Sequence, residues 1–440
     1  MLDVFGDSSL VAAMLDFEAA LAEAAAAEGV VPASAVAPIV AACRAGIDGI
    51  ETLVADARGA GSLAIPLVRA LTAAVAARDP AAAGHVHWGS TSQDVIDSAM
   101  ALVTGRALDP IDGELARLSQ ALQALARAHL TTPILARTLL QPAQVVSFGF
   151  KVVAWLAPLL RARDRLARAR RQALRLQFGG AVGTLASFGE KGPAVAQRLS
   201  ERLGIAAGDA WHVQRDGWVA LGCEVAVLCG SLGKLGTDLA LLAQAEVGEV
   251  AEPSGEGRGG SSAMPQKKNP VAALTAIAAG VRAPHHAAAL LAAMPQAHER
   301  ALGEWQAELA EWPALFLAAH GALVALADAT LGLEVDPERM RDNIARQRGS
   351  VFAEAAAALL APSLGKAKAG AVVGALAARA AAEAGDLQAL VRADPAFAAV
   401  GAGAIDAAFD VDAAARRAGQ VASAQLDRLA RSFPLSGDSP

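Results

Sequence analysis

The stretch from Gly255 to Pro270, GEGRGGSSAMPQKKNP, interrupts an otherwise helical sequence. Four glycines among its first six residues disfavour a helix and allow backbone angles that other residues avoid. Polar donors around such a backbone suit a negatively charged substrate, because loop amides and lysines can close on it and exclude water. The donors are the side chains of Ser261, Ser262, Lys267, Lys268 and Asn269.

A plainer interpretation of the same stretch stays open. Asn269 before Pro270 is typical of an N-cap and first helical residue, and glycine-rich segments are often linkers. A phosphate-binding P-loop is excluded, because Gln266 stands where that motif needs a glycine before its lysine. Local chemistry alone therefore does not decide between a linker and a substrate-binding loop.

The run from residue 260 to residue 270, GSSAMPQKKNP, resembles the signature loop of the fumarase/aspartase superfamily, G-S-S-x-M-P-x-K-x-N-P. Enzymes of that superfamily add or remove groups beta to a carboxylate. The resemblance implies that Ser261 is the catalytic base for the carbon next to a carboxylate. It implies that Lys267 and Asn269 bind the substrate and its developing charge, and it adds Ser262 and Met264 to the substrate-binding residues.

Composition predicts an all-α protein. Hydrophobic residues make up 54% of the 440 residues and aromatic residues only 4%, so alanine and leucine, both strong helix formers, supply most of the packing. The resemblance implies the three-domain fold of the superfamily with a central bundle of long helices. We expect an N-terminal helical domain over 1–108, the bundle over 109–333 with the signature loop at 255–270, and a C-terminal helical domain over 334–440.

Charge and cysteine content narrow the possible partners and location. A net charge of −6 without a basic block argues against nucleic acid. Cys43, Cys223 and Cys229 have no metal-ligand or redox spacing and suit a reducing compartment. The N-terminus lacks the pattern of a signal peptide, and the apolar runs 271–281 and 314–327 are too short to cross a bilayer. We expect a cytoplasmic protein without a membrane partner.

A second motif, HVHWGSTSQDVIDSA, occupies residues 85–99. Its Gly-Ser-Thr-Ser turn predicts a hydroxyl cap on a helix that begins near Gln93, with Asp94 favourable in the first turn. Two histidines without a third ligand do not make a metal site. The stretch resembles the first conserved region of the superfamily, H-x-G-x-T-S-x-D, which implies a carboxylate site at a helix N-terminus. The implied substrate-binding residues are His87, Ser90, Thr91 and Ser92.

A third region, RTLLQPA, begins at Arg137. It resembles the second region of the superfamily, R-T-H-x-Q, and so implies substrate contacts from Arg137, Thr138 and Gln141. Leu139 stands where the fumarases and the lyases of purine and arginine metabolism carry a histidine that acts as acid or charge partner. A leucine cannot transfer a proton, so this departure argues against those activities.

Two further segments indicate one branch of the superfamily. Trp211 to Asp216, WHVQRD, and the run MPQAHERALGEW that ends at Trp305 resemble the muconate cycloisomerases. The match implies substrate contacts from Gln214, Arg215 and Arg300, with Arg300 holding a carboxylate in a bidentate fork. A surface arginine paired with a neighbouring glutamate is the alternative for Arg300.

Long leucine seams predict assembly. Ile111, four leucines and His129 recur at spacings of three and four, and leucines do so again over 228–242, which is a heptad pattern. Helices of this length need packing partners, so we expect subunits to complete the bundle. The resemblance implies a homotetramer whose active sites combine residues of different subunits, and it implies neither a cofactor nor a metal.

The resemblance to the muconate cycloisomerases implies an enzyme that closes 3-carboxy-cis,cis-muconate to its lactone. An adenylosuccinate- or argininosuccinate-type lyase that releases fumarate is the alternative within the superfamily. Of these two, the sequence MPQKKNP favours the argininosuccinate type. A catalytically silent helical scaffold is the alternative from another class. Retention of Ser261, Lys267 and Asn269 argues against a scaffold, because a scaffold needs only the helix cap.

Overall fold

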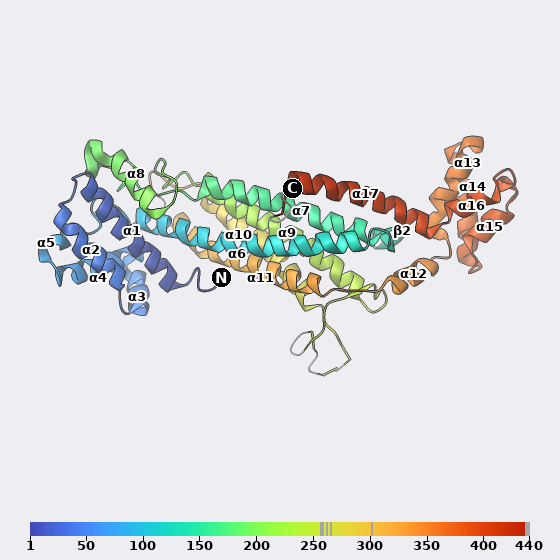
Figure 1. The fold of residues 1–440 in the computed structure, drawn as a ribbon, viewed down its shortest axis with the longest axis horizontal. Helices are drawn as coiled ribbons and strands as arrows, with labels where there is room; N and C mark the ends of the chain where they lie inside the picture. The colour runs from blue at the N-terminus through green and yellow to red at the C-terminus, as the bar shows by residue number, and fades with distance from the viewer. Residues whose placement is uncertain (256–258, 261–262, 265, 301, 436–440) are drawn as a thin grey trace. The chain divides into compact units, whose positions relative to one another are not determined.

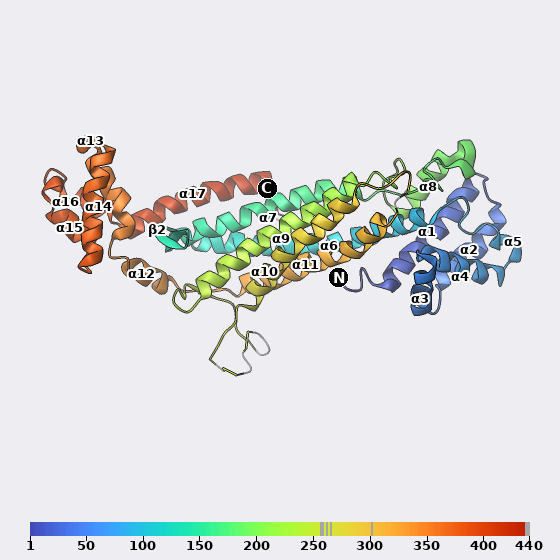
Figure 2. The ribbon, with the colours of Figure 1, turned by 180° about the vertical axis from the view of Figure 1, so that it is seen from behind.

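The structure is a computed structural model that describes residues 1–255, 259–260, 263–264, 266–300 and 302–435. These residues form α-helices with two short two-stranded antiparallel sheets, which confirms the predicted all-α class (Figures 1 and 2). The chain divides into two compact units. Unit 1 holds residues 1–114, 162–230 and 278–323, and unit 2 holds residues 115–161, 231–277 and 324–440. The three predicted domain ranges divide the chain differently and stay a prediction.

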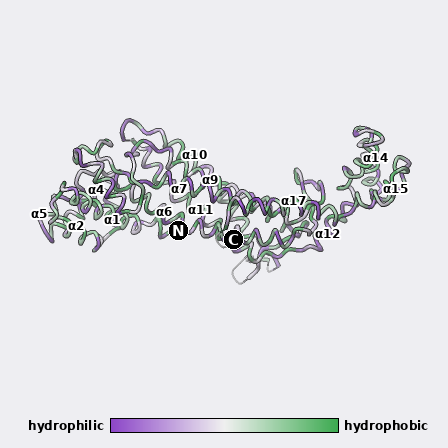
Figure 3. Tube along the Cα trace, turned by 45° about the horizontal axis from the view of Figure 1, so that its top comes forward, coloured by the Kyte–Doolittle hydropathy of each residue, from purple (hydrophilic) through white to green (hydrophobic). Residues whose placement is uncertain are grey.

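Five long helices each contribute one part to unit 1 and the other part to unit 2. Hydrophobic and hydrophilic residues interleave along them, as the coloured trace in Figure 3 shows. Most leucines of the predicted seams lie in the interior, although Leu125 is only partly buried. The buried leucines, each no more than 4% exposed, are Leu115, Leu118, Leu122, Leu228, Leu232, Leu235, Leu239 and Leu242. The helices are α6 (Ser92–Ala128), α7 (Phe148–Ala173), α9 (Asp216–Ala243), α10 (Val271–Ala293) and α11 (Glu304–Leu331).

Unit 1 adds a group of shorter helices, in which α1 packs against α2 and α8. Indole rings form part of its interior, since Trp218 and Trp312 stack with centroids 3.9 Å apart and an interplanar angle of 13°. The rings of Trp211 and Phe316 extend this stack at either end. The added elements are α1 (Asp7–Ala27), α2 (Ala33–Ala45), α3 (Ile50–Ala60), α4 (Ala64–Ala76), α5 (Pro80–Ala83), the 3-10 helix η1 (Ala186–Lys191) and α8 (Gly192–Leu203).

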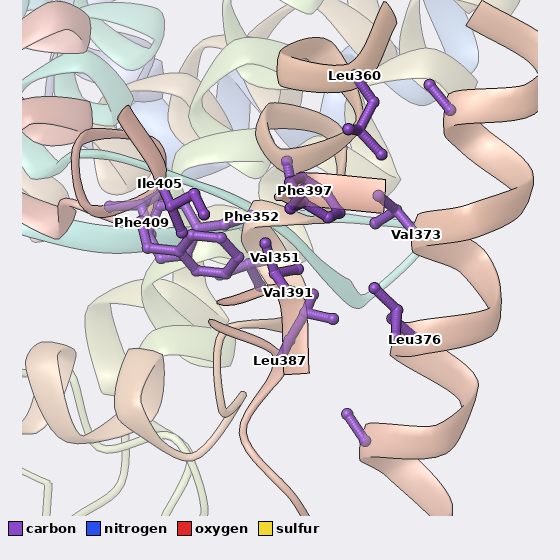
Figure 4. Close-up of a cluster of buried hydrophobic side chains, with 14 of the residues drawn as sticks. Val351, Phe352, Leu360, Val373, Leu376, Leu387, Val391, Phe397, Ile405 and Phe409 are labelled. Atoms are coloured by element: carbon purple, nitrogen blue, oxygen red, sulfur yellow. The ribbon is translucent and has the colours of Figure 1, made fainter. Parts of the chain in front are cut away.

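Unit 2 contains both sheets and the C-terminal helices. A β-hairpin packs against α12 and α17, and its buried residues Leu135 and Val145 join a hydrophobic cluster with the helices that follow α12. Figure 4 shows the part of this cluster between residues 351 and 409. The strands are β1 (Pro133–Thr138) paired with β2 (Gln141–Ser147), and β3 (Val250–Ala251) paired with β4 (Glu334–Val335). The helices are α12 (Pro337–Ala345), η2 (Ser350–Phe352), α13 (Ala353–Leu364), α14 (Lys366–Ala382), α15 (Leu387–Ala393), η3 (Pro395–Phe397), α16 (Ala402–Ala408) and α17 (Val411–Ser432).

Two of the long helices have the length and composition of membrane spans. α9 and α11 are each 28 residues long and contain windows of mean hydropathy 1.5 and 1.7, and the bent pair α2 and α3 is a third candidate if counted as one span. The prediction that the apolar runs are too short is therefore wrong for residues 314–327, which lie inside α11. Within the protein 44% of the α9 window and 50% of the α11 window are buried, as helix packing requires.

Candidate active site

The start of α6 brings three of the predicted substrate-binding residues of unit 1 together. Nη1 of Arg300 donates to the hydroxyl of Thr91 at 2.6 Å, and Nη2 donates to the hydroxyl of Ser92 at 2.9 Å. A hydroxyl that accepts from the guanidinium keeps its own hydrogen for another acceptor. Two hydroxyls, a charged fork and the N-terminus of a 37-residue helix thus meet in one place. This combination suits a carboxylate.

Asp94 organises this turn, and it does so in place of the predicted hydroxyl cap. Its carboxylate is fully buried and accepts from the backbone N–H of Thr91 at 3.1 Å, the N3 side of a capping box. The same carboxylate also accepts hydrogen bonds from the glycine-rich loop that follows α7 and from the segment before α9. The further donors are the Gly179 N–H at 3.0 Å, the Gly180 N–H at 2.8 Å, Gln177 Nε2 at 2.9 Å and His212 Nε2 at 3.0 Å.

Glycine is required where these two loops meet. Gly89 has a φ of +68°, and a Cβ there would lie 2.5 Å from the ring of Phe188. Gly180 has a φ of +70°, and a Cβ there would lie 2.9 Å from the carbonyl oxygen of Gly89. Both the backbone angle and the close approach exclude other side chains. Gly89 and Gly180 therefore fix the turn that carries Ser90 and Thr91.

His87 begins the same turn and is paired with a carboxylate from α1. Its Nδ1 lies 2.5 Å from Oε1 of Glu18, whose side chain is 1% exposed, while the side chain of His87 is 17% exposed. Burial lowers the pKa of His87, but the charge of Glu18, its hydrogen bond and the charge of Asp94 together raise that pKa above its ordinary value. Among the described residues, no group of three or more His, Cys, Asp or Glu is placed to hold a metal ion.

Arg215 does not lie where a substrate can reach it, which corrects the predicted contact. It is 1% exposed, its Nη1 donates to Asp97 at 2.7 Å, and its Nε and Nη2 donate to Glu308. Its guanidinium also lies 4.4 Å from the ring centroid of Trp211. Burial lowers the pKa of Arg215, but the two carboxylates outweigh it and raise that pKa. The residue ties α9 to α6 and α11.

Gln214, next to Arg215, is exposed and lines a cleft of about 460 Å³ within unit 1. His212, Glu299 and the glycine-rich loop at Gly183 line the same cleft. A substrate contact from Gln214 is thus compatible with its position, in contrast to Arg215.

Arg137, in unit 2, has its fork occupied by another residue of the chain. Nη1 and Nη2 donate to the two oxygens of Glu249 at 2.9 and 2.8 Å, and Asn343 Nδ2 donates to the same carboxylate at 2.9 Å. Glu249 is fully buried, so the pair anchors β1 to the segment before β3. The side chain of Arg137 remains 21% exposed beside this pair, so its predicted substrate contact stays a prediction. Burial also lowers the pKa of Lys151. The nearby charge of Arg137 lowers that pKa further, whereas the charge of Glu249 opposes the change.

Thr138 and Gln141 are the last facing pair of the β1–β2 hairpin, and both are exposed. The two residues between them form the turn with positive φ values, +51° for Leu139 and +63° for Leu140. Their side chains are not buried, since Leu139 is 97% and Leu140 is 70% exposed. The apolar substitution in the third region therefore lies at the tip of a hairpin.

The catalytic Ser261 and the neighbouring Ser262 predicted from the signature loop lie outside the described residues. Lys267 is exposed, and its N–H donates to the carbonyl oxygen of Met264 at 3.0 Å. Asn269 joins the two sides of the loop: its N–H donates to Gly259 O at 2.8 Å and its Nδ2 to Gly260 O at 3.3 Å.

The exit of the loop into α10 is held by Glu252, just after β3. Its two oxygens accept from the backbone N–H groups of Ala272 and Ala273 at 2.9 and 2.8 Å. Glu252, Lys268 and Asn269 line a cleft of about 770 Å³ within unit 2. A carboxylate at a helix N-terminus is favourable, so this residue fixes where the loop ends.

Sequence reasoning missed the buried acids of unit 1 as partners of the site. Glu18 marks the apolar face of the first helix, and a carboxylate at a core-facing position needs a partner. Asp97 likewise falls one turn after Asp94 on the buried face of α6. The core-facing positions of these two acids could have indicated that they need partners. The partners themselves lie far away in the sequence, so the sequence does not identify them.

The sequence and the fold are similar to those of known proteins over most of the chain. A family profile described as Lyase matches residues 1–283. The 3-carboxy-cis,cis-muconate cycloisomerase of Bradyrhizobium diazoefficiens is 48% identical over 389 residues, 88% of this chain and 86% of that protein. Nitrosuccinate lyase of Streptomyces davaonensis is 43% identical over 376 residues, 83% of this chain and 79% of that protein. The crystal structure of the 3-carboxy-cis,cis-muconate lactonizing enzyme from Pseudomonas putida matches with a TM-score of 0.90 and 40% identity, over 98% of this chain and 96% of that one.

Proposed function

The chain belongs to the lyase family, and from this membership we propose that it is an enzyme that closes 3-carboxy-cis,cis-muconate to its lactone. The observation that carries the proposal is the agreement between curated relatives and a solved structure on this one activity, over most of the chain. The reaction belongs to the breakdown of aromatic compounds.

The chemistry needs positioning and charge stabilisation. A carboxylate oxygen of the substrate adds to a carbon of its own double bond, and the electron pair of that bond moves toward a second carboxylate. A proton then adds to the carbon alpha to this carboxylate. Holding the oxygen next to the alkene makes the ring closure unimolecular, so binding geometry supplies much of the rate. Donors that face the charged intermediate supply more.

The residues divide these tasks as follows in the proposal. Arg300, Thr91 and Ser92 hold one substrate carboxylate at the start of α6. Lys267 and Asn269 stabilise the enolate-like charge, and Ser261 delivers the proton, as the superfamily resemblance implies. The exposed leucines of the β1–β2 turn provide no proton donor at the histidine position, which suits a reaction that releases no fumarate.

Assembly into a homotetramer with shared active sites is part of the proposal. The predicted residues fall into two sets, one in unit 1 and one in unit 2, and the superfamily combines such regions from different subunits. α10 supports this by presenting Leu274 and Val281, seven residues apart, with exposures of 52% and 62%. An exposed apolar stripe of this kind indicates a protein interface. We also propose that α9 and α11 are bundle helices of a cytoplasmic enzyme rather than membrane spans.

A second candidate activity is elimination from a substituted succinate. The similarity to nitrosuccinate lyase favours it, because that relative matches over a similar share of the chain. Both reactions move a proton next to a carboxylate and differ in the group that adds or leaves, so the same residues can serve either.

The deciding experiment follows the ultraviolet absorbance of the conjugated diene when purified protein is mixed with 3-carboxy-cis,cis-muconate. Nitrosuccinate, adenylosuccinate and argininosuccinate are run in parallel, with release of fumarate as the readout. Loss of the diene with no fumarate from the other three supports the proposal. Fumarate released from one of them, with the muconate unchanged, contradicts it and assigns the chain to a lyase branch.

Arg300→Lys tests the carboxylate site. Lysine keeps the charge but loses the fork to Thr91 and Ser92, so KM for the muconate should rise about tenfold or more, since a lost charged hydrogen bond is worth about 1.5–3 kcal/mol. Arg282→Lys, an exposed arginine of α10, is the matched control and should leave KM unchanged. An unchanged KM for Arg300→Lys would remove this residue from the site.

A further inference from the structure

A buried ion pair stands behind the substrate-binding turn, and one of its members belongs to none of the sequence motifs. Glu18 lies in the middle of α1, with its side chain 1% exposed. Its Oε1 is 2.5 Å from Nδ1 of His87. Its Oε2 has no hydrogen-bond partner among the described residues. The carboxylate of Glu18 is therefore held through its contact with the imidazole.

The backbone brings His87 to this position at an energetic cost. Its φ of +55° is in the left-handed region, which a residue with a side chain adopts at a cost of about 1–2 kcal/mol. The turn then continues with Ser90 N–H donating to the carbonyl oxygen of His87 at 3.3 Å. Thr91, which follows directly, accepts from Arg300. His87 is thus in the same turn as the carboxylate-binding hydroxyls.

The chemistry of the pair defines the charge of the ring. When Nδ1–H donates to a carboxylate, a neutral imidazole leaves Nε2 as an acceptor, whereas an imidazolium leaves Nε2–H as a donor. Two acidic groups act on His87, Glu18 from α1 and Asp94 from α6, and both favour the imidazolium. The side chain of His87 remains 17% exposed, so the ring is open to a ligand in part.

We propose that Glu18 is a positioning residue that holds His87 as an imidazolium, so that its second N–H binds a substrate carboxylate beside Arg300. The proposal rests on the proposed function for the identity of the substrate, which carries three carboxylates. Glu18 touches no substrate and acts through His87 alone.

The sign of the pH effect follows from the raised pKa of His87. The interaction is fully present below the unfolded pKa of about 6.5 and is lost as pH rises through the higher pKa of the folded protein. Affinity for the substrate follows the same course, because the neutral ring no longer offers the N–H. KM should therefore rise with pH above that folded pKa.

The test combines an imidazole titration by NMR with steady-state kinetics on the intact protein. The chain has eight histidines, so the His87 resonance is assigned with His87→Asn. Glu18→Gln keeps the shape and a hydrogen bond but removes the charge. Glu23→Gln is the matched control, since Glu23 is on the same helix and pairs with Arg202.

In the unmodified protein His87 should titrate above 6.5. In Glu18→Gln its pKa should fall by about one unit or more, and the pH at which KM rises should fall equally, which gives about a tenfold higher KM between the two midpoints with little change in kcat. Glu23→Gln should match the unmodified protein in both measurements.

Three results would overturn the inference. The first is a His87 pKa at or below 6.5 in the unmodified protein, which is decisive even if Glu18→Gln does not fold. The second is an unchanged His87 pKa in Glu18→Gln. The third is a lowered pKa with an unchanged KM profile, which leaves the pair a structural role only. If the protein does not act on the muconate at all, the proposed function fails, while the titration still decides the role of Glu18 in holding the charge.

Discussion

At the scale of single residues, the structure gives the three predicted arginines different surroundings. The superfamily match implied substrate contacts from Arg137, Arg215 and Arg300 alike. In the structure only Arg300 faces hydroxyls at a helix start, whereas Arg137 and Arg215 hold buried carboxylates. Those carboxylates lie 112 and 118 residues away along the chain, so local sequence carries no sign of the pairing.

The buried position of Arg215 predicts a large loss of stability on truncation. Arg215→Met should lower the free energy of unfolding by about 3–5 kcal/mol, because it leaves Asp97 and Glu308 buried without their cation. Arg69→Met is the control, since Arg69 is 70% exposed in its pair with Asp56 and should change stability by less than about 1 kcal/mol. Denaturant unfolding followed by circular dichroism measures both. Equal effects of the two substitutions would contradict the central role of the buried pair.

At the scale of elements, the long helices could be predicted and the short strands could not. Leucine spacing over many residues is a strong indication of a helix. The long helices of the structure confirm that prediction, and the similarity to solved structures confirms the superfamily fold. The β1–β2 hairpin covers only residues 133–147, and its turn is Leu-Leu, with neither of the residues that favour a two-residue hairpin turn. Tertiary contacts with α12 and α17 select the strand here.

The strained hairpin turn predicts a gain in stability on substitution. Replacing Leu139 by Asn and Leu140 by Gly should stabilise the protein by about 1–2 kcal/mol, because both positions have positive φ and the new residues adopt it readily. We expect kcat/KM for the muconate to fall at the same time, because strain that persists in a motif region is typical of function. Thermal unfolding and steady-state kinetics measure the two effects. A more stable protein with full activity would show that the leucines are dispensable for the reaction.

At the scale of the whole molecule, the exposed side chains of α10 predict the assembly. Val281→Glu, alone or with Leu274→Glu, should shift the sedimenting species from the proposed tetramer toward smaller forms and reduce activity in parallel, because charge on an apolar interface opposes association. Val54→Glu, on α3 and 38% exposed, is the control and should leave assembly unchanged. A stable monomer with full activity would contradict the shared active site.

The stacked indoles of unit 1 also make the protein its own optical probe. The chain has six tryptophans and no tyrosine, so its near-ultraviolet absorption comes mainly from indole. Trp218 and Trp312, on α9 and α11, are close enough for their electronic transitions to couple. Rings packed this closely contribute to the circular dichroism of the indoles, and this contribution is lost when the rings separate. Because Arg215, which directly precedes α9, also holds Glu308 on α11, the circular dichroism of the indoles reports, without any label, whether these two helices remain together.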